Sequence, residues 1–64
     1  MKKFEFVNYL GHRRAEINVD ASEYWVYLTC QGAMVASLVV KSEESAVSKS
    51  LTYVFEGHVE GGDI

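Results

Sequence analysis

The hydrophobic pattern of this chain changes its period once, from two residues to about 3.6. From residue 4 to residue 40, apolar and polar residues alternate in four runs separated by glycine or small polar residues, which is typical of strands joined by hairpins. The predicted strands are residues 4–10, 15–20, 23–30 and 33–40. Turns are predicted at residues 11–14, 21–22 and 31–32, the last with Gly32, because glycine tolerates positive φ.

One amphipathic helix is predicted after the last strand. Ser42 is a good N-cap, and Glu43 and Glu44 fall in the first turn, where the helix dipole favours anions. Gly57 is suited to end the helix. The apolar stripe recurs at i, i+4, i+7 and i+8, at Val47, Leu51, Val54 and Phe55.

The fold class predicted from this pattern is α+β. We expect one domain over residues 1–64, an antiparallel β-meander of four to five strands with the C-terminal helix packed on one face. Residues 58–64 are expected to fray or to add a short strand. The predicted core is Phe4, Phe6, Ile17, Val19, Val26, Leu28, Leu38, Val40, Val47, Leu51, Val54 and Phe55, with Met34 and Ala36 also inward if the fourth strand keeps a regular register.

Composition excludes several classes of protein. An apolar content of 48% argues against disorder. The longest near-apolar run, residues 33–40, is far short of the ~20 residues of a membrane helix, and no apolar stretch follows Met1-Lys2-Lys3 as in a signal peptide. The single cysteine, Cys30, allows no internal disulfide. We therefore expect a cytoplasmic protein with no membrane partner.

The net charge of −3 is unevenly distributed. Residues 1–14 carry four cations against one acid, whereas residues 15–64 carry two lysines against eight acids. An acidic body suits a basic protein surface, and ordinary solvation of a small protein explains the same distribution.

No group of residues has the spacing of a catalytic or metal site. Cys30 lies in a predicted strand without a base near it in sequence, and His12 and His58 stand alone. We expect no enzymatic activity, no catalytic residue, no metal and no cofactor.

The face of the sheet that one helix leaves open carries Trp25 and Tyr27 at i and i+2, with Tyr9, Val7 and Val39. Exposed aromatic residues on a sheet serve single-strand nucleic-acid binders as stacking platforms, but acidic surroundings disfavour phosphate contacts. A protein interface, or packing against the tail or a second copy, fits these residues better. Unpaired edge strands admit a homodimer.

The order of elements carries a resemblance. Tyr24-Trp25-Val26-Tyr27-Leu28, then Gly32, then a strand, then Ser42-Glu43-Glu44-Ser45 opening a helix resembles a family of small anti-CRISPR proteins that act on the type I-F surveillance complex, over roughly residues 17–56. In that family an antiparallel sheet packs on one helix, and the protein binds backbone subunits of the complex and stops target DNA from pairing with the guide.

The resemblance implies a phage-encoded inhibitor that binds protein subunits of a CRISPR surveillance complex in the host cell. Direct nucleic-acid binding is not expected, because the chain is acidic around the exposed aromatic residues. The basic and aromatic residues that would bind the partner are Tyr9, Arg13, Arg14, Tyr24 and Trp25, to which the open face adds Tyr27. A weaker resemblance, from Glu23–Tyr27, Gly32 and Glu43–Ala46, is to HicB-type antitoxins, which would neutralise a small RNase by docking on it.

Overall fold

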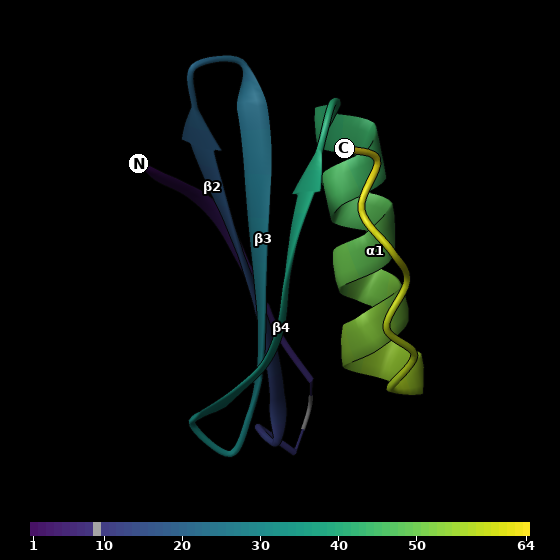
Figure 1. Cartoon of the computed structure of the whole chain (residues 1–64). Helices are drawn as coiled ribbons and strands as arrows, with labels where there is room; N and C mark the ends of the chain where they lie inside the picture. Colours follow the sequence, from purple (N-terminus) through teal and green to yellow (C-terminus); the bar gives the residue numbers. More distant parts are fainter. Residues whose placement is uncertain (9) are drawn as a thin grey trace.

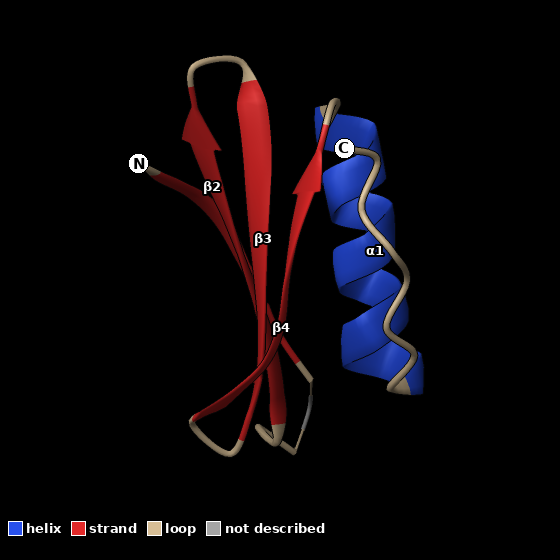
Figure 2. Cartoon of the chain, viewed as in Figure 1, coloured by secondary structure: helices blue, strands red, loops and turns tan. Residues whose placement is uncertain are grey.

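The structure, a computed structural model, describes residues 1–8 and 10–64. Strands β1 (Lys2–Val7), β2 (Arg13–Asp20), β3 (Glu23–Cys30) and β4 (Ala33–Val40) form one antiparallel sheet in the order β1-β2-β3-β4. Helix α1 (Glu43–Glu56) lies on one face of the sheet (Figure 1). In the described part of the chain, no other helix or strand lies on the opposite face (Figure 2). The predicted α+β fold, with an open sheet and one C-terminal helix, is confirmed.

The bounds of β3, β4 and α1 match the sequence pattern, whereas the first hairpin differs. β1 ends at Val7 rather than residue 10, and β2 begins at Arg13 rather than residue 15. The cause is Asn8, whose side-chain Oδ1 accepts the backbone N–H groups of His12 (2.9 Å) and Arg13 (3.3 Å). An asparagine that bonds nearby backbone groups closes a turn locally, so the strands begin and end around it.

The other two hairpins have two-residue turns in which both residues have positive φ. Gln31 and Gly32 have φ of 52° and 84°, as the glycine led us to expect. Ala21 and Ser22 have φ of 49° and 72°, although neither is a glycine. Positive φ at both central positions is what a type I′ turn requires, and side chains with a Cβ adopt it at a cost.

Helix α1 has the predicted caps. The Oγ of Ser42 accepts the backbone N–H of Ser45 (3.1 Å), and Gly57, at φ 75°, donates its N–H to the carbonyl of Tyr53 (2.8 Å). The helix therefore begins and ends where the capping residues in the sequence predict.

The core lies between α1 and the inner face of the sheet. Its buried apolar residues are Ala15, Ile17, Val26, Leu28, Leu38, Val40, Ala46, Tyr53 and Val54. Phe4, Phe6 and Val47 are partly buried against them. The prediction of Phe55 as a core residue is wrong, since 69% of it is exposed.

The buried face of the helix is displaced by one residue from the predicted stripe of Val47, Leu51, Val54 and Phe55. Ala46, Ser50, Tyr53 and Val54 are its buried residues, and they fall at i, i+4, i+7 and i+8. Phe55 lies about 100° further round the helix than Val54, which turns it towards solvent. The phenol of Tyr53 donates to the carbonyl of Thr29 (2.9 Å), so an amphipathic tyrosine fills the position next to the sheet.

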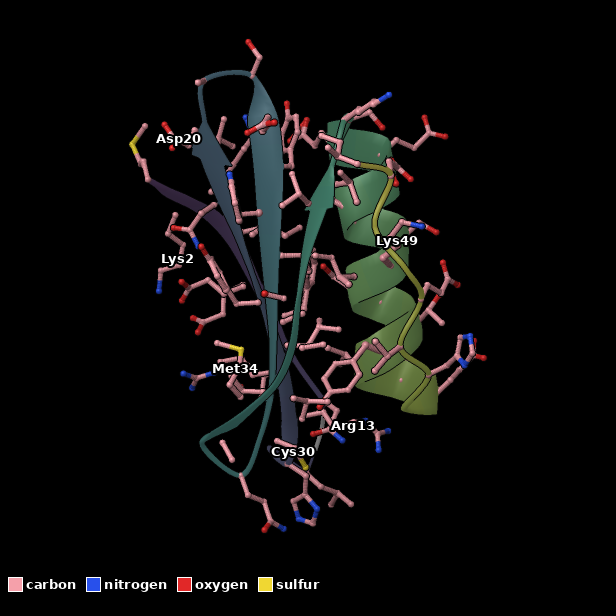
Figure 3. The ribbon with its side chains drawn as sticks, viewed as in Figure 1. Lys2, Arg13, Asp20, Cys30, Met34 and Lys49 are labelled. Carbon is pink, nitrogen blue, oxygen red and sulfur yellow. The ribbon has the colours of Figure 1, made fainter. Side chains whose placement is uncertain are left out.

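The inward placement of Met34 is also wrong. The pairing of β3 with β4 shifts by one residue, from Leu28 opposite Ala36 to Thr29 opposite Met34, so that Val35 is extra. A β-bulge of this kind reverses the faces beyond it. Met34 therefore points away from α1 and is 60% exposed (Figure 3).

Candidate functional site

We define the open face as the side of the sheet that points away from α1. Because side chains alternate along each strand, the strand register assigns them to it in rows across the sheet. Three rows cross all four strands, and they are Lys2–Asn18–Trp25–Val39, Glu5–Glu16–Tyr27–Ser37 and Val7–Arg14–Thr29–Met34. The acidic pair Asp20–Glu23 lies on the same face at the end of β2 and the start of β3. β1 and β2 therefore supply a mainly charged half, and β3 and β4 supply an aromatic and apolar half.

The apolar half of the open face is centred on β3. Trp25 and Tyr27 are two residues apart on this strand and are partly buried. Val39 is directly opposite Trp25 across the ladder, and Met34 is one row further on. The broad, rigid rings of Trp25 and Tyr27 provide contact area with little loss of conformational entropy on binding.

The charged half is linked by ion pairs among its own side chains. Lys2 Nζ lies 3.7 Å from Glu5 Oε1 and 3.6 Å from Glu16 Oε1, and Arg14 Nε lies 3.2 Å from Glu5 Oε2. Asn18 Nδ2 donates to Glu16 Oε2 (3.0 Å). The Asn18 amide, and after it Lys2, holds the pKa of Glu16 below its ordinary value. Two cations thus meet two acids in these pairs, and with Asp20 at the end of β2 this half carries an excess of one negative charge.

The two arginines named from the sequence lie on opposite faces of the sheet. Arg14 is on the open face, whereas Arg13 is on the side of α1 (Figure 3). Arg13 Nε donates to the carbonyl of Val54 (3.1 Å) and its Nη2 to that of Phe55 (3.4 Å). A cation at the carbonyl end of a helix also complements the helix dipole, so Arg13 has a structural role.

The four aromatic candidates are divided in a similar way. Trp25 and Tyr27 share the open face, but Tyr24 alternates to the other side, where it packs against the core. Tyr9 lies outside the described residues. Of the six residues named from the sequence, the structure brings together Arg14, Trp25 and Tyr27.

Other residues of the open face escaped the sequence analysis. Met34 was assigned to the interior because the bulge at Val35 leaves no mark in an apolar run. Lys2, Glu5, Glu16 and Asn18 were not grouped, because their proximity depends on the register of β1 against β2, which itself shifts between Lys2 and Phe4. The alternation of polar residues in β2 was the one available signal.

The remaining chemistry of the described chain is sparse. Over residues 1–8 and 10–64, no group of three or more His, Cys, Asp or Glu side chains is placed to hold a metal ion. Cys30 is a free thiol, partly buried at the end of β3. Within the same residues, no helix has the length and apolar character needed to cross a membrane.

The fold and this face define the chain as a small α+β protein whose open antiparallel sheet presents one unpartnered side. No protein-family model, no curated protein and no solved structure matches it. Its function therefore has to be argued from the surface itself.

Proposed function

We propose that the protein is a non-enzymatic inhibitor that binds another protein through its open face, and that its target is a type I CRISPR surveillance complex. The observation that carries the proposal is the apolar half of that face, where Trp25, Tyr27, Met34 and Val39 form one surface away from α1. Aromatic residues and methionine are enriched at protein interfaces, and charged residues are depleted at interface centres.

The charges of the open face favour a protein partner over nucleic acid. Its two cations, Lys2 and Arg14, each pair with Glu5, and Lys2 also pairs with Glu16. Binding a phosphate backbone would break these pairs and would bring phosphates towards two carboxylates. The ion pairs do not oppose a protein partner, because they can remain at the rim of an interface.

The sequence resemblance of residues 17–56 supports a surveillance complex as the target, and the expected effect is a block of its DNA binding. The partner would be a protein subunit of the complex, and the binding residues would be Trp25, Tyr27 and Arg14 with Met34. An antitoxin that neutralises an RNase is the alternative, and it would use the same face. The two differ in the partner rather than in the surface.

The test is inhibition of target-DNA binding by a purified type I surveillance complex, measured by electrophoretic mobility shift. Met34→Glu places a charge in the apolar half at an exposed position, so it should raise the inhibitor concentration needed at least tenfold, a loss of ~1.4 kcal/mol. Phe55→Glu is the matched control, because Phe55 is 69% exposed on α1, away from the open face. It should inhibit like the wild type.

Trp25→Ala is a second variant on the same face, and far-UV circular dichroism checks the fold of all three. Full inhibition by both folded open-face variants would contradict the assignment of the face. Failure of the wild-type chain to inhibit any type I complex, together with protection of cells from a co-expressed RNase, would favour the antitoxin.

A further inference from the structure

The tail, residues 58–64, runs back along α1, and its last residues reach the outer edge of β4 at Val39. Figure 1 shows it running from the end of α1 back along the helix to the end of β4. The backbone N–H groups of Asp63 and Ile64 donate to the carbonyl of Val39, at 3.0 and 3.3 Å. That carbonyl therefore points outward from the sheet, where the next strand of a larger sheet would bind.

Side chains fix the tail in this position. Asp63 Oδ2 accepts the backbone N–H of Lys41 (3.4 Å), and Lys49 Nζ, on α1, lies 3.5 Å from Glu60 Oε1 and 3.9 Å from Asp63 Oδ1. The side chain of Lys49 is only 16% exposed and points towards the tail (Figure 3). The tail is thus bound to both β4 and α1.

Gly62 allows the close approach of the two backbones. A Cβ at Gly62 would lie 2.6 Å from the carbonyl oxygen of Val39 and 3.1 Å from its nitrogen, whereas a Cβ at Gly61 meets nothing within 4 Å. Backbone atoms this close leave no room for a side chain, so glycine is needed at position 62 and not at position 61.

The edge of β4 lacks the charges that usually protect an edge strand. β4 contains no charged residue, and Met34 and Val35, near its start and away from the tail contact at Val39, are 60% and 49% exposed. The opposite edge strand, β1, carries Lys2, Lys3 and Glu5. Charges on an edge strand discourage pairing with another chain, and an uncharged apolar edge invites it. The bulge at Val35 and the tail are the protections that β4 has.

We propose that the edge of β4 is a pairing interface for a second copy of this chain, and that the tail occupies the Val39 end of it in the monomer. Two β4 strands pair antiparallel around a two-fold axis, which makes the interface self-complementary. Two uncharged strands meet without like-charge repulsion, as two β1 strands would not. The tail already shows that the outward carbonyl of Val39 accepts backbone N–H groups from another segment. The proposal concerns the edge of the sheet and stands without the proposed function.

The experiment measures the oligomeric state of full-length variants by sedimentation equilibrium. Gly62→Ala should convert a monomer into a concentration-dependent dimer, whereas the matched control Gly61→Ala should remain monomeric. Lys49→Glu, which repels Glu60 and Asp63, should also dimerise. Its control is Ser48→Glu, at an exposed neighbouring position on α1.

A second substitution identifies the interface. Val35→Lys on the Gly62→Ala background places a charge on the edge of β4 and should restore the monomer. In the dimer, the outward backbone N–H of Val39 should gain protection from hydrogen exchange. A monomeric Gly62→Ala protein with a released tail would overturn the proposal, as would a dimer that survives Val35→Lys, or a wild-type dimer whose tail remains bound to Val39.

Discussion

The adjacent residues Arg13 and Arg14 show how far alternation on a strand separates two similar side chains. The guanidinium of Arg13 bonds the carbonyls of Val54 and Phe55 at the end of α1. The side chain of Arg14 is 57% exposed and forms an ion pair with Glu5 on the neighbouring strand β1. One arginine therefore joins the helix to the sheet, and the other belongs to the open face.

Arg13→Ala should lower the free energy of unfolding by about 1–2 kcal/mol, because it removes charge-assisted hydrogen bonds to helix carbonyls. Arg14→Ala should lower it by less than about 0.5 kcal/mol, because an exposed ion pair contributes little. Urea denaturation followed by circular dichroism measures both. Equal losses in the two variants would contradict the structural role of Arg13.

Ser22 occupies the second positive-φ position of the β2–β3 turn, at φ 72°. Ser22→Gly should raise the free energy of unfolding by about 1 kcal/mol, because glycine adopts this conformation without the Cβ penalty. Ala33→Gly, at a strand position without positive φ, should instead destabilise by about 0.5–1 kcal/mol. Both are measured by the same urea titration. A Ser22→Gly variant that is no more stable than the wild type would indicate an unstrained turn.

At the scale of the residue, the sequence correctly predicts which face of the sheet a side chain lies on wherever the alternation along the strand is unbroken. Trp25 and Tyr27 share the open face as alternation requires. Met34 was misplaced because a β-bulge leaves no signature in an apolar run. Phe55 was misplaced because a helix buries the residues whose size and shape fit against the sheet, and these need not be its most hydrophobic ones. Small Ala46 and Ser50 allow that contact here, whereas hydrophobicity alone points to the larger Phe55.

At the scale of the element, the bounds of β3, β4 and α1 follow from local signals such as Gly32, Ser42 and Gly57. The position of the tail does not, because it depends on contacts with residues far away in the sequence. A pair of glycines such as Gly61-Gly62 normally indicates a flexible segment, yet in this structure Gly62 is the residue whose backbone fits closely against Val39.

The tail should detach in acid. The Ser45 hydroxyl, and after it the backbone N–H of Lys41 and the charge of Lys49, holds the pKa of Asp63 below its ordinary value of 3.8. A carboxyl whose pKa is lowered by folding stabilises the folded form above its unfolded pKa, and this contribution is lost as pH falls through the lower folded pKa. Tail contacts should therefore be intact at neutral pH, should begin to weaken below about pH 4, and should be lost as the pH falls through the lower folded pKa of Asp63.

Backbone NMR shifts of Val39 and Ile64 follow this transition directly. Asp63→Asn keeps an acceptor for the Lys41 N–H but removes the titrating group. In that variant the shifts should lose the step below about pH 4, while acid effects elsewhere in the protein persist. An unchanged step in Asp63→Asn would show that another carboxyl controls the tail.

At the scale of the whole molecule, stability and association are linked because the core is small. A domain of this length buries only about 60% of its unfolded surface, and the buried apolar residues here include two alanines. Pairing with a second copy adds stability by mass action, since only the folded chain presents β4. Exposing this edge should therefore make the melting temperature depend on concentration.

The Gly62→Ala protein should show that dependence and the wild type should not. For a dimer that unfolds to separate chains, each tenfold rise in concentration adds ~1.4 kcal/mol per dimer, which shifts the melting temperature of a domain this size by roughly 3–5 °C. Thermal unfolding over a hundredfold range of concentration, with Trp25 fluorescence and circular dichroism as separate probes, measures the shift. At low concentration Gly62→Ala should melt below the wild type, because the tail contacts are lost, and at high concentration the difference should shrink or reverse. A constant difference at every concentration would mean that the tail stabilises the monomer without blocking a dimer.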